Sequence, residues 1–152
     1  MPDEVTSAVV SLSNRSLSYR RIDVNLLPPT ANTYVRHTRR GVHYLTEEAK
    51  HFQNAVAVRA MLQQRWRPTG LLGAVICCWS PTWVTRKMTP RIRDIDNTPK
   101  VAFDSAHKAL GLEDCCVWEF HPFKAWADFT RTTIWLFDLG LTVRYHVRNE
   151  KI

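Results

Sequence analysis

Three aspartates and a lysine are the residues of this sequence whose types and spacing could carry out catalysis. Asp94 and Asp96 stand two residues apart in the stretch RIRDIDNTPK, and Lys100 follows one helical turn after Asp96. In an extended segment, alternate side chains point to one face with Cα atoms about 6 to 7 Å apart, so two carboxylates can engage one cation. Asp114 comes after a further predicted helix, and an antiparallel return of the chain would bring it beside the first pair.

Such a cluster predicts metal-dependent hydrolysis of phosphodiesters. Without a cation the three carboxylates would repel one another, and hard oxygen ligands suit Mg²⁺, with Mn²⁺ as a substitute. The metal would polarise a phosphate and lower the pKa of a bound water, while Lys100 would stabilise charge on the phosphoryl oxygens or order that water. The spacing alone is a weak signal, and a structural alternative stays open. In that alternative the acids pair with nearby arginines, cap a turn or begin a strand, and the lysine is solvated.

The net charge of +7 favours a polyanionic partner, because clustered Lys and Arg gain affinity by releasing phosphate counterions. Two segments concentrate this charge, VRHTRRG at 35–41 and TRKMTPRIR at 85–93, and the second runs directly into the acidic motif. Solvated loops without a partner are the alternative. The side chains expected to contact phosphates are Arg36, Arg39, Arg40, Arg86, Lys87, Arg91 and Arg93.

Other residue types favour no second site. The four cysteines form two adjacent pairs, Cys77 with Cys78 and Cys115 with Cys116, whereas zinc ligands are usually separated by about two to four residues. We expect them to be buried or half-buried free thiols of strands. The six histidines show no H-E-x-x-H pairing, and the five glycines form no phosphate-binding loop. Hydrolases with a serine triad and NTPases are thereby disfavoured, and no small-molecule cofactor is expected.

The elements that must position the acids are predicted to alternate between strands and helices. Apolar periodicity predicts strands at 21–27 and 71–79, and two more at 115–123 and 132–141. One helix is predicted at 46–65 with Thr46 as its N-cap, and a second from Asn97 to Gly111. The fold class is therefore α/β or α+β, a single domain with a mixed sheet and two main helices.

Helical spacing predicts which residues of these helices face the sheet. They are Ala49, Phe52, Val56 and Ala60 on the first helix, and Phe103, Ala106 and Leu110 on the second.

The ends of the chain are predicted to lie outside the domain. Residues 1–18 are rich in serine and are expected to form a flexible tail, the domain to span 19–145, and 146–152 to form a C-terminal tail. No apolar run approaches the roughly 20 residues needed to cross a bilayer. The first residues are acidic, unlike those of a secretory signal, so we expect a cytoplasmic protein without a membrane partner.

Two stretches, PPTANTYVRH and RDIDNTPKVAFDSAHKALGLEDCCV, resemble the RusA family of Holliday-junction resolvases, and the resemblance spans roughly residues 20–138. It implies a Mg²⁺-dependent homodimeric endonuclease of bacteria or their prophages. Such enzymes nick two strands of a four-way DNA junction symmetrically, in recombination and repair.

The resemblance also implies roles for individual residues. It places the catalytic acids on Asp94, Asp96 and Asp114 and the catalytic lysine on Lys100, and it adds Asn32 to the DNA-binding residues.

Three positions depart from the family pattern. Thr30 stands where a serine is common, Glu113 replaces an aspartate, and Pro99 precedes the lysine.

Two alternatives to a resolvase remain: a protein of the same fold that binds branched DNA without cutting it, and another metal-dependent nuclease acting on RNA or flaps. The complete set of acids and lysine favours an enzyme, because a protein that only binds DNA gains nothing from carboxylates facing phosphates. A homodimer is expected, since two helices cannot cover both faces of a sheet and six tryptophans are many for one core.

Overall fold

A computed structural model of the chain describes residues 1–30, 33, 35–37, 43–62, 66–89, 97–112 and 116–140. Its helices are α1 (Asp3–Ser13), α3 (Glu47–Met61), α4 (Asn97–Leu110) and the short 3-10 helix η1 (Pro81–Trp83). Its strands are β1 (Ser18–Val24), β2 (Val35–His37), β3 (His43–Leu45), β4 (Leu71–Trp79), β5 (Val117–Ala125) and β6 (Arg131–Gly140). No helix of the described ranges is both long and apolar enough to cross a membrane.

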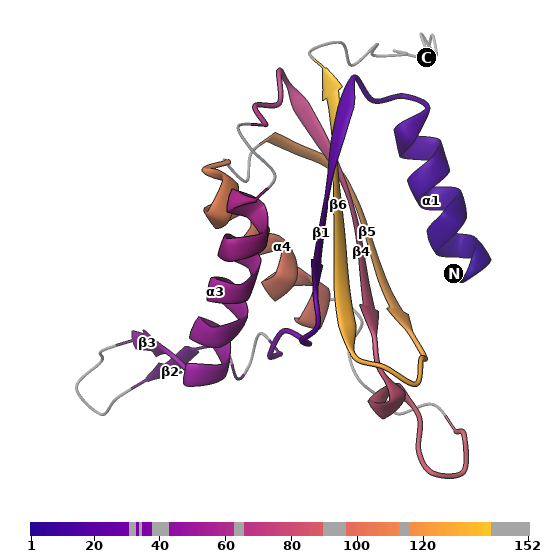
Figure 1. Cartoon of the computed structure of the whole chain (residues 1–152), viewed down its shortest axis with the longest axis vertical. Coiled ribbons are helices and arrows are strands. Elements are labelled where there is room, and N and C mark those ends of the chain that lie inside the picture. Colours follow the sequence, from indigo (N-terminus) through magenta and orange to yellow (C-terminus); the bar gives the residue numbers. More distant parts are fainter. Residues whose placement is uncertain are drawn as a thin grey trace, which may run out of the picture.

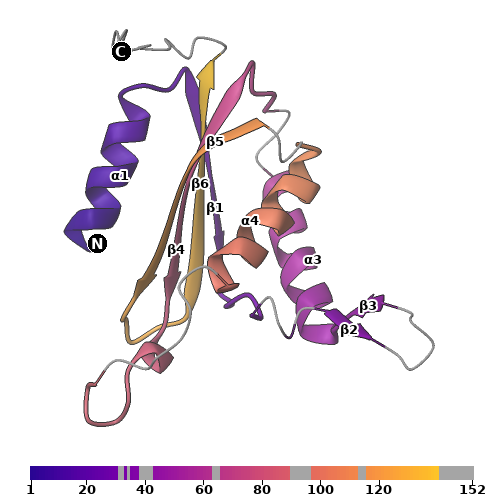
Figure 2. The same ribbon diagram turned by 180° about the vertical axis from the view of Figure 1, so that it is seen from behind.

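The main sheet has four strands in the order β1-β6-β4-β5. Strand β6 is antiparallel to both β1 and β4, whereas β4 and β5 are parallel and are connected through α4. Helices α3 and α4 lie on one face of this sheet and α1 lies on the other (Figures 1 and 2). The predicted α+β class with a mixed sheet is confirmed. A separate antiparallel pair, β2 with β3, extends from the N-terminal end of α3 (Figure 1).

The face under α3 and α4 holds the larger core, as the helical spacing predicts. Thr46 caps α3 by accepting a hydrogen bond from the backbone N–H of Ala49 at 3.3 Å. All four residues of α3 predicted to face the sheet are buried, and so are Phe103 and Ala106 of α4, while Leu110 is half-buried. Local capping and periodicity therefore suffice to orient both helices.

Gly111 ends α4, as predicted, because it adopts a left-handed backbone with φ 65°. The N–H of Gly111 donates to the carbonyl of Lys108 at 3.3 Å, and the N–H of Leu112 donates to the carbonyl of His107 at 3.0 Å. This pair of bonds satisfies two carbonyls that a helix end would otherwise leave unpaired.

Helix α1 occupies the segment where the sequence predicts a flexible tail, so the described residues form three main helices rather than two. Val5 and Leu12 of α1 are buried against the second face of the sheet. Gly73 of β4 permits the close approach, since a Cβ there would lie 2.7 Å from a methyl carbon of Leu12. The prediction missed this helix because serines interrupt its apolar stripe, although Val5, Val9 and Leu12 follow helical spacing. The predicted domain boundaries stay a prediction.

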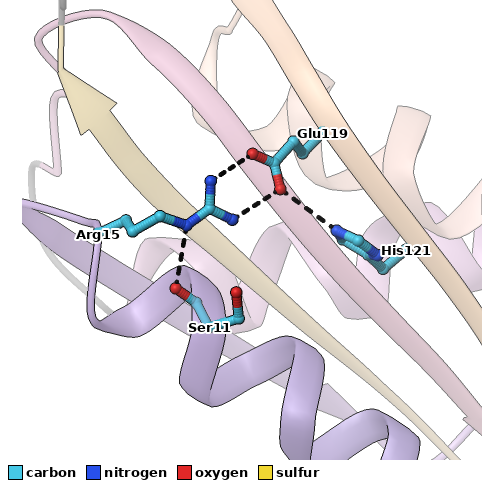
Figure 3. A network of polar contacts seen from close by, with 4 residues as sticks. All are labelled: Ser11, Arg15, Glu119 and His121. Atoms are coloured by element: carbon cyan, nitrogen blue, oxygen red, sulfur yellow. Dashed lines mark hydrogen bonds and ion pairs between the residues drawn. The ribbon is translucent and has the colours of Figure 1, made fainter. Parts of the chain in front are cut away.

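A two-pronged ion pair ties the end of α1 to the edge strand β5 (Figure 3). Arg15 donates to the two carboxylate oxygens of Glu119 at 2.7 and 2.8 Å, and its Nε–H donates to the carbonyl of Ser11 at 3.2 Å. His121 Nε2 lies 3.4 Å from the same carboxylate. The hydrogen bond from Arg15 is the main reason that the pKa of Glu119 is held below its usual value.

The cysteines of β4 are buried free thiols, as predicted. Cys78 belongs to the core under α3 and α4, whereas Cys77 belongs to the core under α1. Burial is the main cause that raises the pKa of both thiols to about 12. Cys116 is half-buried and free, and Cys115 lies outside the described residues.

We predict that Arg15→Ala loosens α1 and lowers the free energy of unfolding by about 0.5 to 1 kcal/mol near neutral pH, since the pair is partly exposed. The pKa of Glu119 is lowered by folding, so the pair stabilises above the ordinary Glu pKa of about 4.3 and the effect disappears as pH falls through the lowered value. Chemical unfolding should therefore separate wild type from Arg15→Ala at about pH 7, and the difference should shrink as the pH falls below the ordinary Glu pKa of about 4.3.

The matched control is Lys50→Ala, which removes the ion pair of Lys50 with Glu47, also 2.7 Å long, within α3. Amide hydrogen exchange should accelerate in α1 for Arg15→Ala only. Equal exchange in α1 for wild type and Arg15→Ala would refute the role of this pair.

Candidate active site

The first turn of α4 positions the predicted catalytic lysine. Lys100 is exposed, whereas Thr98 and Pro99 beside it are buried. A proline is tolerated there because an N–H in the first turn has no helical carbonyl to reach. Pro99 therefore leaves the start of α4 intact, and the lysine projects from a rigid helix.

The three predicted acids, Asp94, Asp96 and Asp114, lie outside the described residues. Their described neighbours stand at opposite ends of α4, with Asn97 at its start and Leu112 after its end. A helix of 14 residues is about 21 Å long. The return of Asp114 to the first pair stays a prediction.

A pocket of about 490 Å³ lies beside the start of α4. Pro28 and Pro29 line it together with Glu48 and His51 of α3 and Thr98 of α4. The Pro-Pro loop of the resemblance thus lies next to the helix that carries Lys100. Glu48 and His51 are not among the predicted site residues. They stand three residues apart on a predicted helix, which places them on one face of it.

Thr30, one of the departures from the family pattern, closes the Pro-Pro loop. Its hydroxyl lies 3.1 Å from that of Thr33, and its carbonyl accepts from the backbone N–H of Thr33 at 2.9 Å. A serine could make the same hydroxyl contact, so this departure preserves the polar group that the turn uses.

Arg86 and Lys87, two of the predicted DNA-binding residues, are exposed at the tip of an ordered turn. The backbone N–H of Thr85 donates to the carbonyl of Thr89 at 2.8 Å, and the two hydroxyls lie 2.6 Å apart. Met88 completes the turn with a left-handed backbone at φ 59°. This turn extends beyond η1 at the end of the sheet where β5 and β6 join (Figures 1 and 2).

The remaining predicted DNA-binding residues cannot be placed by their side chains. Arg36 is described by its backbone alone, in β2. The other predicted residues lie outside the described ranges; they are Asn32, Arg39, Arg40, Arg91 and Arg93. Within the described ranges no group of three or more His, Cys, Asp or Glu side chains could hold a metal ion. The predicted ligands are not among those ranges, so the metal site stays a prediction.

Comparison with known families identifies the domain. The family model described as endodeoxyribonuclease RusA matches residues 26–136. That span contains the Pro-Pro loop, α3, β4, α4 and β5, together with all three acids and Lys100, and it leaves α1 outside. No curated protein matches the chain at a significant level.

We predict that Thr85→Val makes the basic turn more dynamic, because it removes the hydroxyl that pairs with Thr89 and accepts from the N–H of Lys87 at 3.2 Å. Amide exchange in 85–89 should accelerate while exchange in β4 stays as in the wild type. The control is Thr130→Val, the same change at an exposed threonine of the β5–β6 turn. Unchanged exchange at 85–89 would show that the hydroxyl does not hold the turn.

Proposed function

We propose that this chain, which belongs to the RusA family of endodeoxyribonucleases, resolves four-way DNA junctions. It would do so by hydrolysing one phosphodiester in each of two opposed strands. The observation that carries the proposal is the family match over residues 26–136. Within it lie the D-x-D-N-x-x-K motif, Asp114 and both basic segments. Recombination and repair of DNA are the processes that such cleavage would serve.

The proposed cofactor is Mg²⁺, held by Asp94, Asp96 and Asp114. The donor set supports it, because carboxylate oxygens are the ligands that this hard cation prefers. The bound ion would supply a water of lowered pKa and neutralise charge on the scissile phosphate. Lys100, exposed on the first turn of α4, would stabilise negative charge on the phosphoryl oxygens from a fixed position.

We infer that two chains complete each site. What supports this proposal is that the described neighbours of these acids, Asn97 and Leu112, lie at the start of α4 and beyond its end, and α4 is about 21 Å long. A closed two-fold pairing would place Asp114 of one chain beside Asp94 and Asp96 of the other and would create two equivalent sites. This arrangement supplies one cut for each of two opposed strands.

Apolar surface for such a pairing lies on the edge strand β5 rather than on the sheet face that was predicted to be shared, since α1 covers that face. Trp118 and Phe120 of the edge strand β5 are 52% and 37% exposed, although Phe120 also packs against Phe103 of α4 with ring centroids 5.2 Å apart. Exposed aromatic side chains on an edge strand are typical of association surfaces.

We predict that Asp94→Asn or Asp96→Asn abolishes cleavage of a four-way junction and leaves binding as tight as in wild type or tighter, because one repulsive charge is removed. Lys100→Ala should slow the single-turnover rate by about 10²-fold or more. Asp128→Asn, at an exposed turn, is the matched control and should cut normally. Cleavage at wild-type rate by either acid variant would reject the site.

Linear duplex, flap and RNA substrates in the same assay would identify another nuclease specificity.

Mixed dimers test whether the sites are shared. Asp94→Asn and Asp114→Asn chains should each be inactive alone, but their mixed dimer should regain one intact shared site and nick a cruciform plasmid. A mixture of Asp94→Asn with Asp96→Asn should stay inactive, because each site then lacks one acid. No recovery in the first mixture, with heterodimers demonstrated, would contradict sharing while leaving the nuclease proposal intact.

A further inference from the structure

Three arginines outside the predicted DNA-binding set line one pocket beside β1. The pocket has a volume of about 330 Å³ and is lined by Arg21, Asp23, Asn25, Arg59 and Arg131. Arg21 and Asp23 come from β1, Arg59 from the last turn of α3, and Arg131 from the first residue of β6. Strand β1 pairs with β6 and packs against α3, so side chains of these three elements can meet beside β1.

Aromatic rings and one carboxylate fix two of the guanidinium groups. The guanidinium of Arg21 lies 5.6 Å from the ring centroid of Trp135, and that of Arg131 lies 5.1 Å from that of Phe129. Arg21 also pairs with Asp23 at 2.8 Å, and Asp23 accepts from the hydroxyl of Thr133 at 2.8 Å. Stacking of this kind holds the planar guanidinium of each arginine in place.

The described residues do not balance the charge of the pocket. Three arginines and one aspartate line it, which leaves two positive charges. Neither Arg59 nor Arg131 forms an ion pair with any other described residue, and the buried Nε–H of Arg131 has no hydrogen-bond acceptor there. Guanidinium groups match the oxygens of a phosphate in geometry and charge, so a phosphodiester is the ligand that this lining favours.

Adjoining pockets connect the arginines to the predicted catalytic end. A pocket of about 500 Å³ shares Asn25 and Arg59 with the arginine pocket, and it shares His51 with the pocket beside the start of α4. Three neighbouring pockets therefore lie between Thr98 and Arg131, each sharing lining residues with the next. A nucleic-acid backbone leaving the α4 end can follow these pockets.

We propose that the pocket of Arg21, Arg59 and Arg131 binds a backbone phosphate of a DNA arm extending from the catalytic end. The inference rests on the proposed function for the identity of the polymer. The pocket would provide a positioning contact that sets the affinity for DNA and the path of the arm. This contact is separate from the residues that act on the scissile bond.

The test measures binding of the full chain to a four-way junction and to linear duplex over a range of salt, without divalent metal. Arg59→Ala and Arg131→Ala should each weaken binding about fivefold for every DNA sequence and reduce the slope of log affinity against log salt by about 0.9. Arg59→Lys should keep the slope. Arg67→Ala, at an exposed arginine outside this pocket, is the matched control and should keep both quantities. The single-turnover cleavage rate at saturating protein should not change, and thermal unfolding checks that each variant folds.

A neutral methylphosphonate placed at successive positions of one arm locates the contact. At one position it should weaken binding by wild type about fivefold and have no further effect on Arg59→Ala, because both changes remove one interaction. Additive effects at every position, or an unchanged salt slope in both arginine variants, would overturn the proposal. Binding of inorganic phosphate that depends on Arg59, with DNA affinity unchanged, would also overturn it by identifying a small-anion site. Since duplex binding is measured without cleavage, failure of the resolvase proposal would be seen separately.

Discussion

The burial of β4 and β6 on both faces is the constraint on which the rest of this structure depends. Both strands are inaccessible along almost their whole length, and β4 carries only apolar residues apart from Gly73, so neither face of the sheet can remain in water. Helices α3 and α4 cover one face, which fixes α4 beside the Pro-Pro loop and makes Lys100 available at its start. Helix α1 covers the other, and the Arg15–Glu119 pair holds its end against β5. Among the described strands, the edges of the sheet remain open to partners.

The sequence predicted those elements whose determinants are local. Thr46, Gly111 and the apolar spacing of α3 each act within one or two helical turns, and the strand at 71–79 agrees with β4 residue for residue. The prediction failed for α1, although a signal was present in another part of the chain. The unbroken apolar run of β4 already required cover on both faces, and two helices connected on one side could not provide it.

The candidate site divides in the same way. The spacing of Asp94, Asp96 and Lys100 is local, so the sequence could propose it directly, whereas the position of Asp114 depends on how far α4 carries the chain. The arginine pocket lay beyond sequence reasoning for a related reason. Its three arginines are far apart in the chain and meet only because β1 pairs with β6 and packs against α3. Arginines at isolated positions of a sequence do not show that their side chains meet in one pocket, because the tertiary fold determines which of them come together.

The proposed arrangement gives a physical reason for acids in a basic protein. Asp94, Asp96 and Asp114 would repel the phosphates that the basic segments attract, so DNA would approach the catalytic end fully only when a cation offsets their charge. By linkage, DNA and metal would then strengthen the binding of each other. The described lining of the arginine pocket carries excess positive charge without any metal, and a further pocket lies between it and the pocket beside the start of α4. It would hold an arm whether or not metal is present, so that the metal governs engagement of the scissile bond rather than capture of the DNA.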